Sequence, residues 1–272
     1  MDAKLDFDAT KLFEALKYQI HVAIDYCHTL EKTDVLWIEA FGDVTVQGRD
    51  QIEVKEYKDN LTDGHENFWK TLNNWLKIEF NHEEYKNLII LTTQSYGKRA
   101  SLKDWEQLNA EQRLNLLDNI YKKTEESFKK RNESLGSNND GKNLLTTNSG
   151  ENTHKENKPS EILKLQRKIL APDVRESLLK AIPKIKIITE QPDLQGLVTE
   201  YKKHYLRGIQ PNRKDQFLDD LCGFMASTDK ITKGWKITAA EFDKKYQELT
   251  ARYLICTVKF PHLDSDLLVS DR

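Results

Sequence analysis

Cysteine is scarce in this sequence of 272 residues. Cys27, Cys222 and Cys256 lie far apart, are odd in number and form no Cys-x-x-Cys pair. This pattern argues against a zinc site and is typical of a reducing cytoplasm. No apolar run approaches the roughly 20 residues that cross a bilayer, and the acidic beginning, MDAKLDFD, lacks the apolar core of a signal peptide. We therefore predict a cytoplasmic protein that does not associate with membranes.

The sequence also lacks an excess of either charge. It has 42 Lys and Arg against 44 Asp and Glu, a formal net charge of −2. No global basic field therefore attracts nucleic acid, and any DNA-binding surface has to be local. Charged residues make up 32% and hydrophobic residues 38% of the chain, which is typical of a globular protein with a polar surface. The length allows one large domain or two small ones.

Residues 37–58, WIEAFGDVTVQGRDQIEVKEYK, hold the most informative pattern. Apolar and polar residues alternate at 44–46 and again at 52–54, which is the period of a half-buried strand. The intervening residues 48–50, Gly-Arg-Asp, predict a turn. We therefore expect an antiparallel hairpin here.

Three charged side chains of this hairpin are predicted to converge. Residues two apart on a strand face the same side, so Glu53 and Lys55 share a face. Asp43 begins the first strand and can meet them across the hairpin. Carboxylate oxygens suit Mg²⁺, and a lysine offsets the charge of an attacking hydroxide or a phosphate. The pattern predicts a hydrolytic metal site; the alternative is an exposed hairpin with ordinary salt bridges.

Apolar periodicity predicts the other elements. Helices are expected at residues 10–31, 66–80, 102–131, 160–170, 172–183, 194–206, 213–226 and 238–253. Further strands are expected at residues 35–39, 87–93, 184–189 and 235–238. The near-continuous apolar run NLIILTT at 87–93 is typical of a central strand covered on both faces.

One segment has a different composition. Residues 132–159 are almost all Asn, Ser, Gly, Thr, Lys and Glu, and predict a flexible surface insertion. The chain then divides into a core at 1–131, the insertion at 132–159 and a mostly helical region at 160–272. The last residues complete no recognisable element, so we expect the chain to be part of a longer protein.

The order of helix, three strands, helix and strand, with Asp-x9-Glu-x-Lys on the hairpin, resembles the PD-(D/E)xK, or restriction-endonuclease-like, nuclease core. One family within this superfamily is closer: the double-stranded DNA endonuclease domain of bacterial antiphage effectors, including those of cyclic-oligonucleotide (CBASS) systems. The sequence is similar to that domain in Gln19 on the first helix and in the segments IEAFGDV, IEVKEYKD and LIILTT. The resemblance covers residues 10–93 well and residues 184–248 only vaguely. That family often carries Gln or Asp in place of Glu53; Glu fits the wider superfamily.

The resemblance implies a fold and a metal site. The fold is a mixed α/β (α+β) one, an αβββαβ core with an additional helical C-terminal region. Mg²⁺, replaceable by Mn²⁺, would be held by Asp43, Glu53 and the carbonyl group of Val54. Glu39 would hold a second metal or a metal-bound water. Carboxylates and a lysine so close together perturb one another's pKa values.

The resemblance also implies catalytic and DNA-contacting roles. Lys55 would orient the attacking water or stabilise the pentavalent phosphate, and Gln19 would contact that water, Lys55 or the scissile phosphate. Two basic pairs are the candidates for contacting the DNA backbone: Lys98 and Arg99 after the fourth strand, and Lys203 and Arg207 on a basic helix face. Plain solvated surface is the alternative for both pairs.

We interpret the sequence as a Mg²⁺-dependent endonuclease that cuts double-stranded DNA as the effector of an antiphage defence system. The expected partners are DNA, a sensor or ATPase protein of the same system, and a second copy of the chain in a homo-oligomer. Two alternatives stay open: a catalytically silent nuclease-like interaction module, and a sequence-specific restriction endonuclease.

Overall fold

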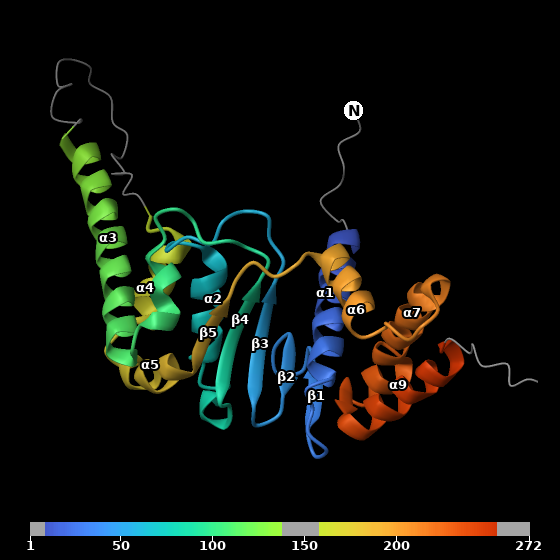
Figure 1. The fold of residues 1–272 in the computed structure, drawn as a ribbon. Helices are drawn as coiled ribbons and strands as arrows, with labels where there is room; N and C mark the ends of the chain where they lie inside the picture. Colours follow the sequence, from blue (N-terminus) through green and yellow to red (C-terminus); the bar gives the residue numbers. More distant parts are fainter. Residues whose placement is uncertain (1–8, 138–157, 255–272) are drawn as a thin grey trace, which may run out of the picture.

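The computed structural model describes residues 9–137 and 158–254. The first six major elements follow the predicted order of helix, three strands, helix and strand (Figure 1). They are α1 (Ala9–Cys27), β1 (Val35–Ile38), β2 (Val44–Val46), β3 (Asp50–Lys55), α2 (Glu66–Trp75) and β4 (Asn87–Thr92). The predicted mixed α/β fold is confirmed.

Six strands form one open sheet in the order β5-β4-β3-β2-β1-β6. β1, β2 and β3 pair antiparallel, whereas β3, β4 and β5 run parallel. The edge strands β5 (Ile185–Ile188) and β6 (Lys236–Thr238) come from the second half of the chain. β3 therefore lies in the interior of the sheet, where the antiparallel part meets the parallel part.

The rest of the described chain is mostly helical, as predicted. Its helices are α3 (Ala110–Ser137), α4 (Glu161–Ile169), α5 (Arg175–Ala181), α6 (Leu194–His204), α7 (Lys214–Met225), α8 (Thr228–Thr232) and α9 (Ala239–Tyr253). Short 3-10 turns are η1 (His82–Glu84), η2 (Ser101–Gln107), η3 (Ile182–Lys184) and η4 (Pro211–Arg213). No helix in the described segments is long and apolar enough to cross a bilayer.

Side-chain caps explain where two of these helices begin. The Ser160 hydroxyl accepts the backbone N–H of Leu163 at 3.2 Å and caps α4, as its position before an amphipathic run predicts. Thr238 and Glu241 form a reciprocal capping box at the start of α9.

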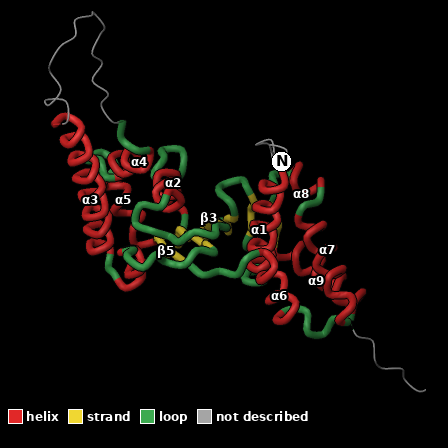
Figure 2. Tube along the Cα trace, turned by 90° about the horizontal axis from the view of Figure 1, so that it is seen from above, coloured by secondary structure: helices red, strands yellow, loops and turns green. Residues whose placement is uncertain are grey.

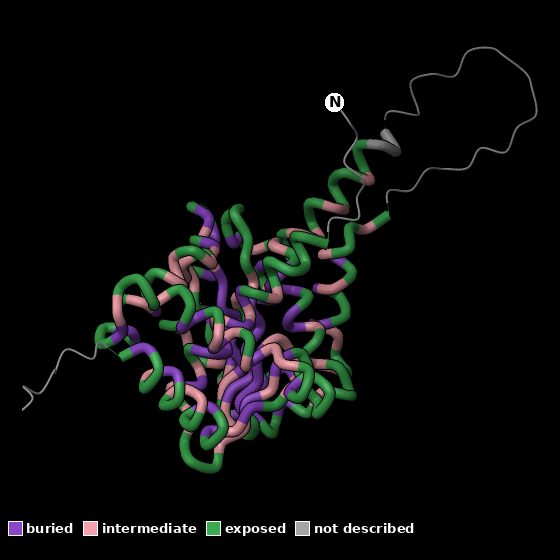
Figure 3. The backbone as a smooth tube through the Cα atoms, turned by 90° about the vertical axis from the view of Figure 1, so that its right-hand side faces the viewer, coloured by how far each residue is buried: buried purple, intermediate pink, exposed green. Residues whose placement is uncertain are grey.

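Helices cover both faces of the sheet (Figures 1 and 2). β4 divides its side chains between two hydrophobic clusters: Ile89 and Leu91 join the cluster with α1, α6, α7 and α9, whereas Leu88 and Ile90 join the cluster with α2, α3, α4 and α5. The interior strands β2, β3 and β4 are almost continuously buried, whereas buried and exposed residues alternate along the edge strand β5 (Figure 3). The prediction of a central strand covered on both faces is therefore confirmed.

Three predicted boundaries differ from the structure. Asp50 belongs to β3, because it pairs with Val46 and Asn87, and the turn is formed by residues 47–49. The predicted helix at 66–80 ends at Trp75. The helix predicted at 102–131 is a 3-10 turn followed by α3, which continues to Ser137. The remaining residues of the predicted insertion, 138–157, lie outside the described residues.

Candidate active site at the end of β3

β3 separates its side chains between the two faces of the sheet. Ile52 and Val54 enter the hydrophobic cluster beneath α1. Gln51, Glu53 and Lys55 face α2, where Gln51 accepts a hydrogen bond from the Trp75 indole of that helix, and Glu53 and Lys55 line a cavity together with α2 residues. Glu53 and Lys55 therefore share a face, as their spacing predicts.

Asp43 reaches the same point from the turn before β2. The Lys55 Nζ donates hydrogen bonds to Glu53 Oε2 at 2.9 Å and to Asp43 Oδ2 at 3.1 Å. Asp43 Oδ2 also accepts the backbone N–H of Val54 at 2.7 Å, which fixes the carboxylate against β3. The structure thus brings the three predicted side chains together around one ammonium group.

These charges are largely withdrawn from solvent, with side-chain exposures of 16% for Asp43, 10% for Glu53 and 20% for Lys55. Burial, followed by the neighbouring Glu53 charge, raises the pKa of Asp43 to about 6 in spite of Lys55. Burial alone would lower the pKa of Lys55, but the two carboxylates outweigh it and raise that pKa. One ammonium shared by two carboxylates leaves surplus negative charge, which a divalent cation would neutralise.

Glu53 has a second anchor that the motif does not reveal. Gln51 Nε2 donates to Glu53 Oε1 at 2.9 Å and to the Phe41 carbonyl at 3.4 Å. Gln51 Oε1 in turn accepts the indole N–H of Trp75 on α2. This chain holds Glu53 in one orientation. Its only signal in the sequence is that Gln51 precedes Glu53 by two residues and so shares its face.

Gly42 provides the space that this arrangement needs. Its φ of +125° is strained for any residue with a side chain. A Cβ atom at this position would lie 1.9 Å from Gln51 Nε2 and 3.1 Å from Glu53 Oε1. Glycine before Asp43 therefore allows the turn to approach β3 closely enough for the three charged groups to meet.

Gln19 lies beside the site, as the resemblance implies. Together with Asp43, Val54 and Lys55 it lines a cavity of about 190 Å³ between α1 and β3. Its Oε1 atom is buried and has no hydrogen-bond partner among the described residues. An unpartnered buried acceptor next to Asp43 is available to a water molecule or to an ammonium group.

Glu39 is not placed with the other acidic residues. It lies in the turn after β1 with a φ of 54°, and its backbone N–H donates to the Asp43 carbonyl at 3.1 Å. Its side chain is exposed and lines neither cavity next to the site. The structure therefore does not bring the Glu39 side chain into either cavity with the carboxylate pair.

The two predicted DNA-contacting pairs have different positions. Lys98 and Arg99 line a hollow that shares two wall residues with the cavity over Glu53 and Lys55. Lys203 and Arg207 are exposed at the end of α6, on the α1 side of the sheet, and line none of the cavities next to the site. Of the two pairs, the first lines a hollow that adjoins the cavity of the carboxylates, and the second does not.

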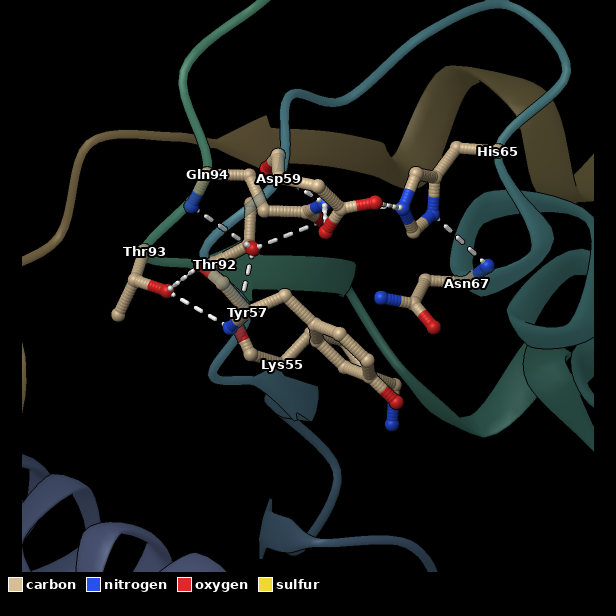
Figure 4. Close-up of polar contacts among 8 residues, drawn as sticks. All are labelled: Lys55, Tyr57, Asp59, His65, Asn67, Thr92, Thr93 and Gln94. Atoms are coloured by element: carbon tan, nitrogen blue, oxygen red, sulfur yellow. Dashed lines mark hydrogen bonds and ion pairs between the residues drawn. The ribbon is translucent and has the colours of Figure 1, made fainter.

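The chain that leaves β3 is tied to the end of β4 (Figure 4). Thr92 Oγ1 donates to the Lys55 carbonyl at 2.8 Å. Thr93 Oγ1 accepts the backbone N–H of Tyr57 at 2.9 Å and donates to the Tyr57 carbonyl at 2.8 Å. These bonds fix the backbone on both sides of Glu56 and so restrict where Lys55 can move.

The residues present fit a magnesium ion better than a zinc ion. No group of three His, Cys, Asp or Glu side chains within residues 9–137 and 158–254 is arranged to hold a metal. Asp43 and Glu53 offer two carboxylates, and Val54 lines the small cavity beside Asp43. Mg²⁺ is commonly held by one or two carboxylates together with water and substrate phosphates, whereas structural zinc needs four protein ligands.

No protein-family model matches the chain, and no curated protein matches it in sequence. Two solved structures are similar to it, both of the Acinetobacter baumannii Cap4 SAVED/CARF-domain containing receptor, one with the cyclic trinucleotide 3'3'3'-cAAA and one with 2'3'3'-cAAA. Each is 12% identical and covers 93% of this chain, with TM-scores of 0.42 and 0.39. The chain spans 49% and 46% of those two chains, about half their length.

Proposed function

We propose that this chain hydrolyses phosphodiester bonds in double-stranded DNA with the help of Mg²⁺, as the nuclease of an antiphage defence system. The observation that supports the chemistry is the convergence of Asp43 Oδ2 and Glu53 Oε2 on Lys55 Nζ, at 3.1 Å and 2.9 Å. DNA as the substrate and defence as the setting come from the resemblance of residues 10–93 to antiphage endonuclease domains.

The residues that would hold the metal are Asp43, Glu53 and Val54 through its carbonyl oxygen. When bound, Mg²⁺ supplies positive charge next to the phosphate and makes a water more acidic. Lys55 is anchored within reach of both carboxylates and can donate to the developing negative charge on the phosphate. Gln19, with its free buried acceptor, can orient the attacking water.

The raised pKa of Asp43 predicts that metal binding and cleavage depend on pH. This carboxyl has to be ionised to bind a cation, and its pKa is about 6. Metal binding and cleavage should therefore rise as the pH increases through about 6.

The experiment is cleavage of a supercoiled plasmid in Mg²⁺ by the wild-type chain and by the Asp43→Ala, Lys55→Ala double variant. We expect cutting by the wild type and none by the double variant; cutting that survives both substitutions would refute the assignment. Lys244→Ala is the matched control, because Lys244 is exposed on α9 and lines none of the cavities beside the site.

The two alternative functions give different results. A crystal soaked in Mn²⁺ should show the ion between Asp43 and Glu53; no bound ion there would favour a silent interaction module. Sequencing of the cut ends separates general DNA degradation from cleavage at one defined sequence.

A further inference from the structure

A cavity of about 550 Å³ lies between the end of β3 and α2. Glu53 and Lys55 of the candidate site line it from the sheet, and Asn67, Lys70 and Thr71 line it from the helix. The cavity is far larger than the roughly 30 Å³ that one water molecule occupies, so it has room for part of a substrate.

Two buried side chains of α2 in the wall of this cavity carry a polar atom without a hydrogen-bond partner among the described residues. Asn67 is 8% exposed and Thr71 is 1% exposed. The Asn67 Nδ2 and Thr71 Oγ1 atoms have no hydrogen-bond partner among the residues that the structure describes. Four residues apart, they lie on the same side of the helix, and the Asn67 carboxamide points into the space beside Tyr57 (Figure 4). Buried polar groups are nearly always hydrogen-bonded, so a partner from outside the chain is expected.

The other groups around the cavity show what kind of partner fits. Its carboxylates already have cationic or N–H partners: Glu53 with Lys55, Asp59 with His65, and Glu66 with Lys70. Among the buried side chains that line the cavity, the unpartnered polar atoms are therefore Asn67 Nδ2 and Thr71 Oγ1, both of which can donate. Free donors require an acceptor, and an anionic oxygen is the strongest acceptor available to them.

The beginning of α2 adds to this preference. His65 Nδ1 accepts the backbone N–H of Asn67 at 3.2 Å and caps the helix, and His65 Nε2 lies 2.9 Å from Asp59 Oδ2. This pair holds the N-terminal turn of a helix of ten residues at the cavity wall. The partial positive charge of a helix N-terminus favours an anion.

We propose that this cavity binds the phosphodiester group adjacent to the scissile one in the DNA strand that is cut, with Asn67 Nδ2 and Thr71 Oγ1 as its donors. The inference rests on the proposed nuclease function, because Lys55, together with the metal that Glu53 would help to hold, would bind the scissile phosphate in the same cavity. Asn67 and Thr71 are then binding residues that position the strand, and they take no part in the chemical step.

The test compares KM and kcat for a short DNA duplex in Mg²⁺. Asn67→Asp keeps the shape of the side chain but places a carboxylate against the phosphate, and should raise KM about tenfold or more while kcat stays within about twofold. Asn73→Asp adds the same charge to α2 at a residue that lines none of the described cavities near the site, and should leave KM unchanged.

Thr71→Val is a second variant in case Asn67→Asp folds poorly. Because the Thr71 hydroxyl has no partner in the free protein, its removal should raise KM without lowering the melting temperature. Unchanged KM values in both folded variants, or a fall in the melting temperature of Thr71→Val, would overturn the inference. A wild-type chain that cuts no DNA would instead refute the proposed function, and this inference would fall with it.

Discussion

Replacing Asp43 with asparagine should stabilise the metal-free protein and at the same time abolish cleavage. Asp43 is held close to Glu53 by the shared Lys55 and is mostly buried, and its pKa is raised from 3.8 to about 6. A carboxyl whose pKa is higher in the folded state binds its proton more tightly there than in the unfolded chain. Ionisation of Asp43 therefore costs folding free energy.

The size of this free-energy cost, and the pH range over which it appears, follow from the difference between the folded and unfolded pKa values of Asp43. Between about pH 4 and pH 6 the folded protein binds more protons than the unfolded chain, so its stability falls as the pH rises. The difference between 3.8 and about 6 corresponds to roughly 3 kcal/mol of unfolding free energy above this window. An asparagine oxygen can still accept the backbone N–H of Val54 and cannot ionise. We expect Asp43→Asn to recover a large part of that free energy.

The assay is urea unfolding of both proteins with EDTA at about pH 4 and about pH 8. The variant should be more stable than the wild type at the higher pH. The difference should be small at the lower pH, where folded Asp43 is protonated and the unfolded carboxyl is close to its own pKa of 3.8. Mg²⁺ should then stabilise the wild type and leave the variant unchanged. Equal stabilities at both pH values, or a less stable variant at the higher pH, would refute the view that burial and the Glu53 charge raise the pKa of Asp43.

Two further substitutions test the parts of the site separately. Lys55→Met leaves both carboxylates buried without their cation and should cost about 3–5 kcal/mol near pH 8. The loss should be smaller near pH 5, where Asp43 is protonated; an equal loss at both pH values in urea unfolding would contradict this. Gly42→Ala should cost at least about 2 kcal/mol and abolish plasmid cleavage, because the new methyl group displaces the Gln51 amide from Glu53. Gly48→Ala is its control: φ is +70° but the space is open, so cleavage should persist and the loss should stay near about 1 kcal/mol. Equal losses of stability and of cleavage in the two glycine variants would show that backbone strain, and not the displaced Gln51 amide, causes the effect of Gly42→Ala.

The acidic residues and lysine of the site could be predicted because the geometry that joins them is local. Glu53 and Lys55 are two residues apart on one strand, and Asp43 is opposite them in the same hairpin. The strand period and the turn decide which side chains meet, and both are visible in the sequence. Glu39 has the right residue type and a suitable spacing, but it lies in a turn with a φ of 54°, and its exposed side chain lines neither cavity next to the site. Such a backbone angle at a glutamate leaves no signal in the pattern.

The support for the site could not be predicted because it depends on packing between distant segments. Gln51 bonds to Trp75 of α2, 24 residues further along the chain. Asn67 and Thr71 line the same cavity as Lys55, and this depends on how α2 lies against the sheet. Helical periodicity places these residues on α2 but says nothing about which strand the helix covers.

The second half of the chain contributes directly to the sheet that holds the site. β5 pairs with β4 from Leu88 to Leu91, and β4 in turn pairs along the whole of β3. Buried Arg113 and Trp105 donate hydrogen bonds to the Ile185 carbonyl at 2.9 Å and 3.1 Å, joining the segment before α4 to β5. Removing residues 160–272 would leave the Arg113 and Trp105 donors without their acceptor, which costs folding free energy for each unpaired donor. It would also expose the backbone N–H and C=O groups along one edge of β4. The carboxylate pair therefore depends on a core to which both halves of the chain contribute, although every charged member of the candidate site comes from the first half.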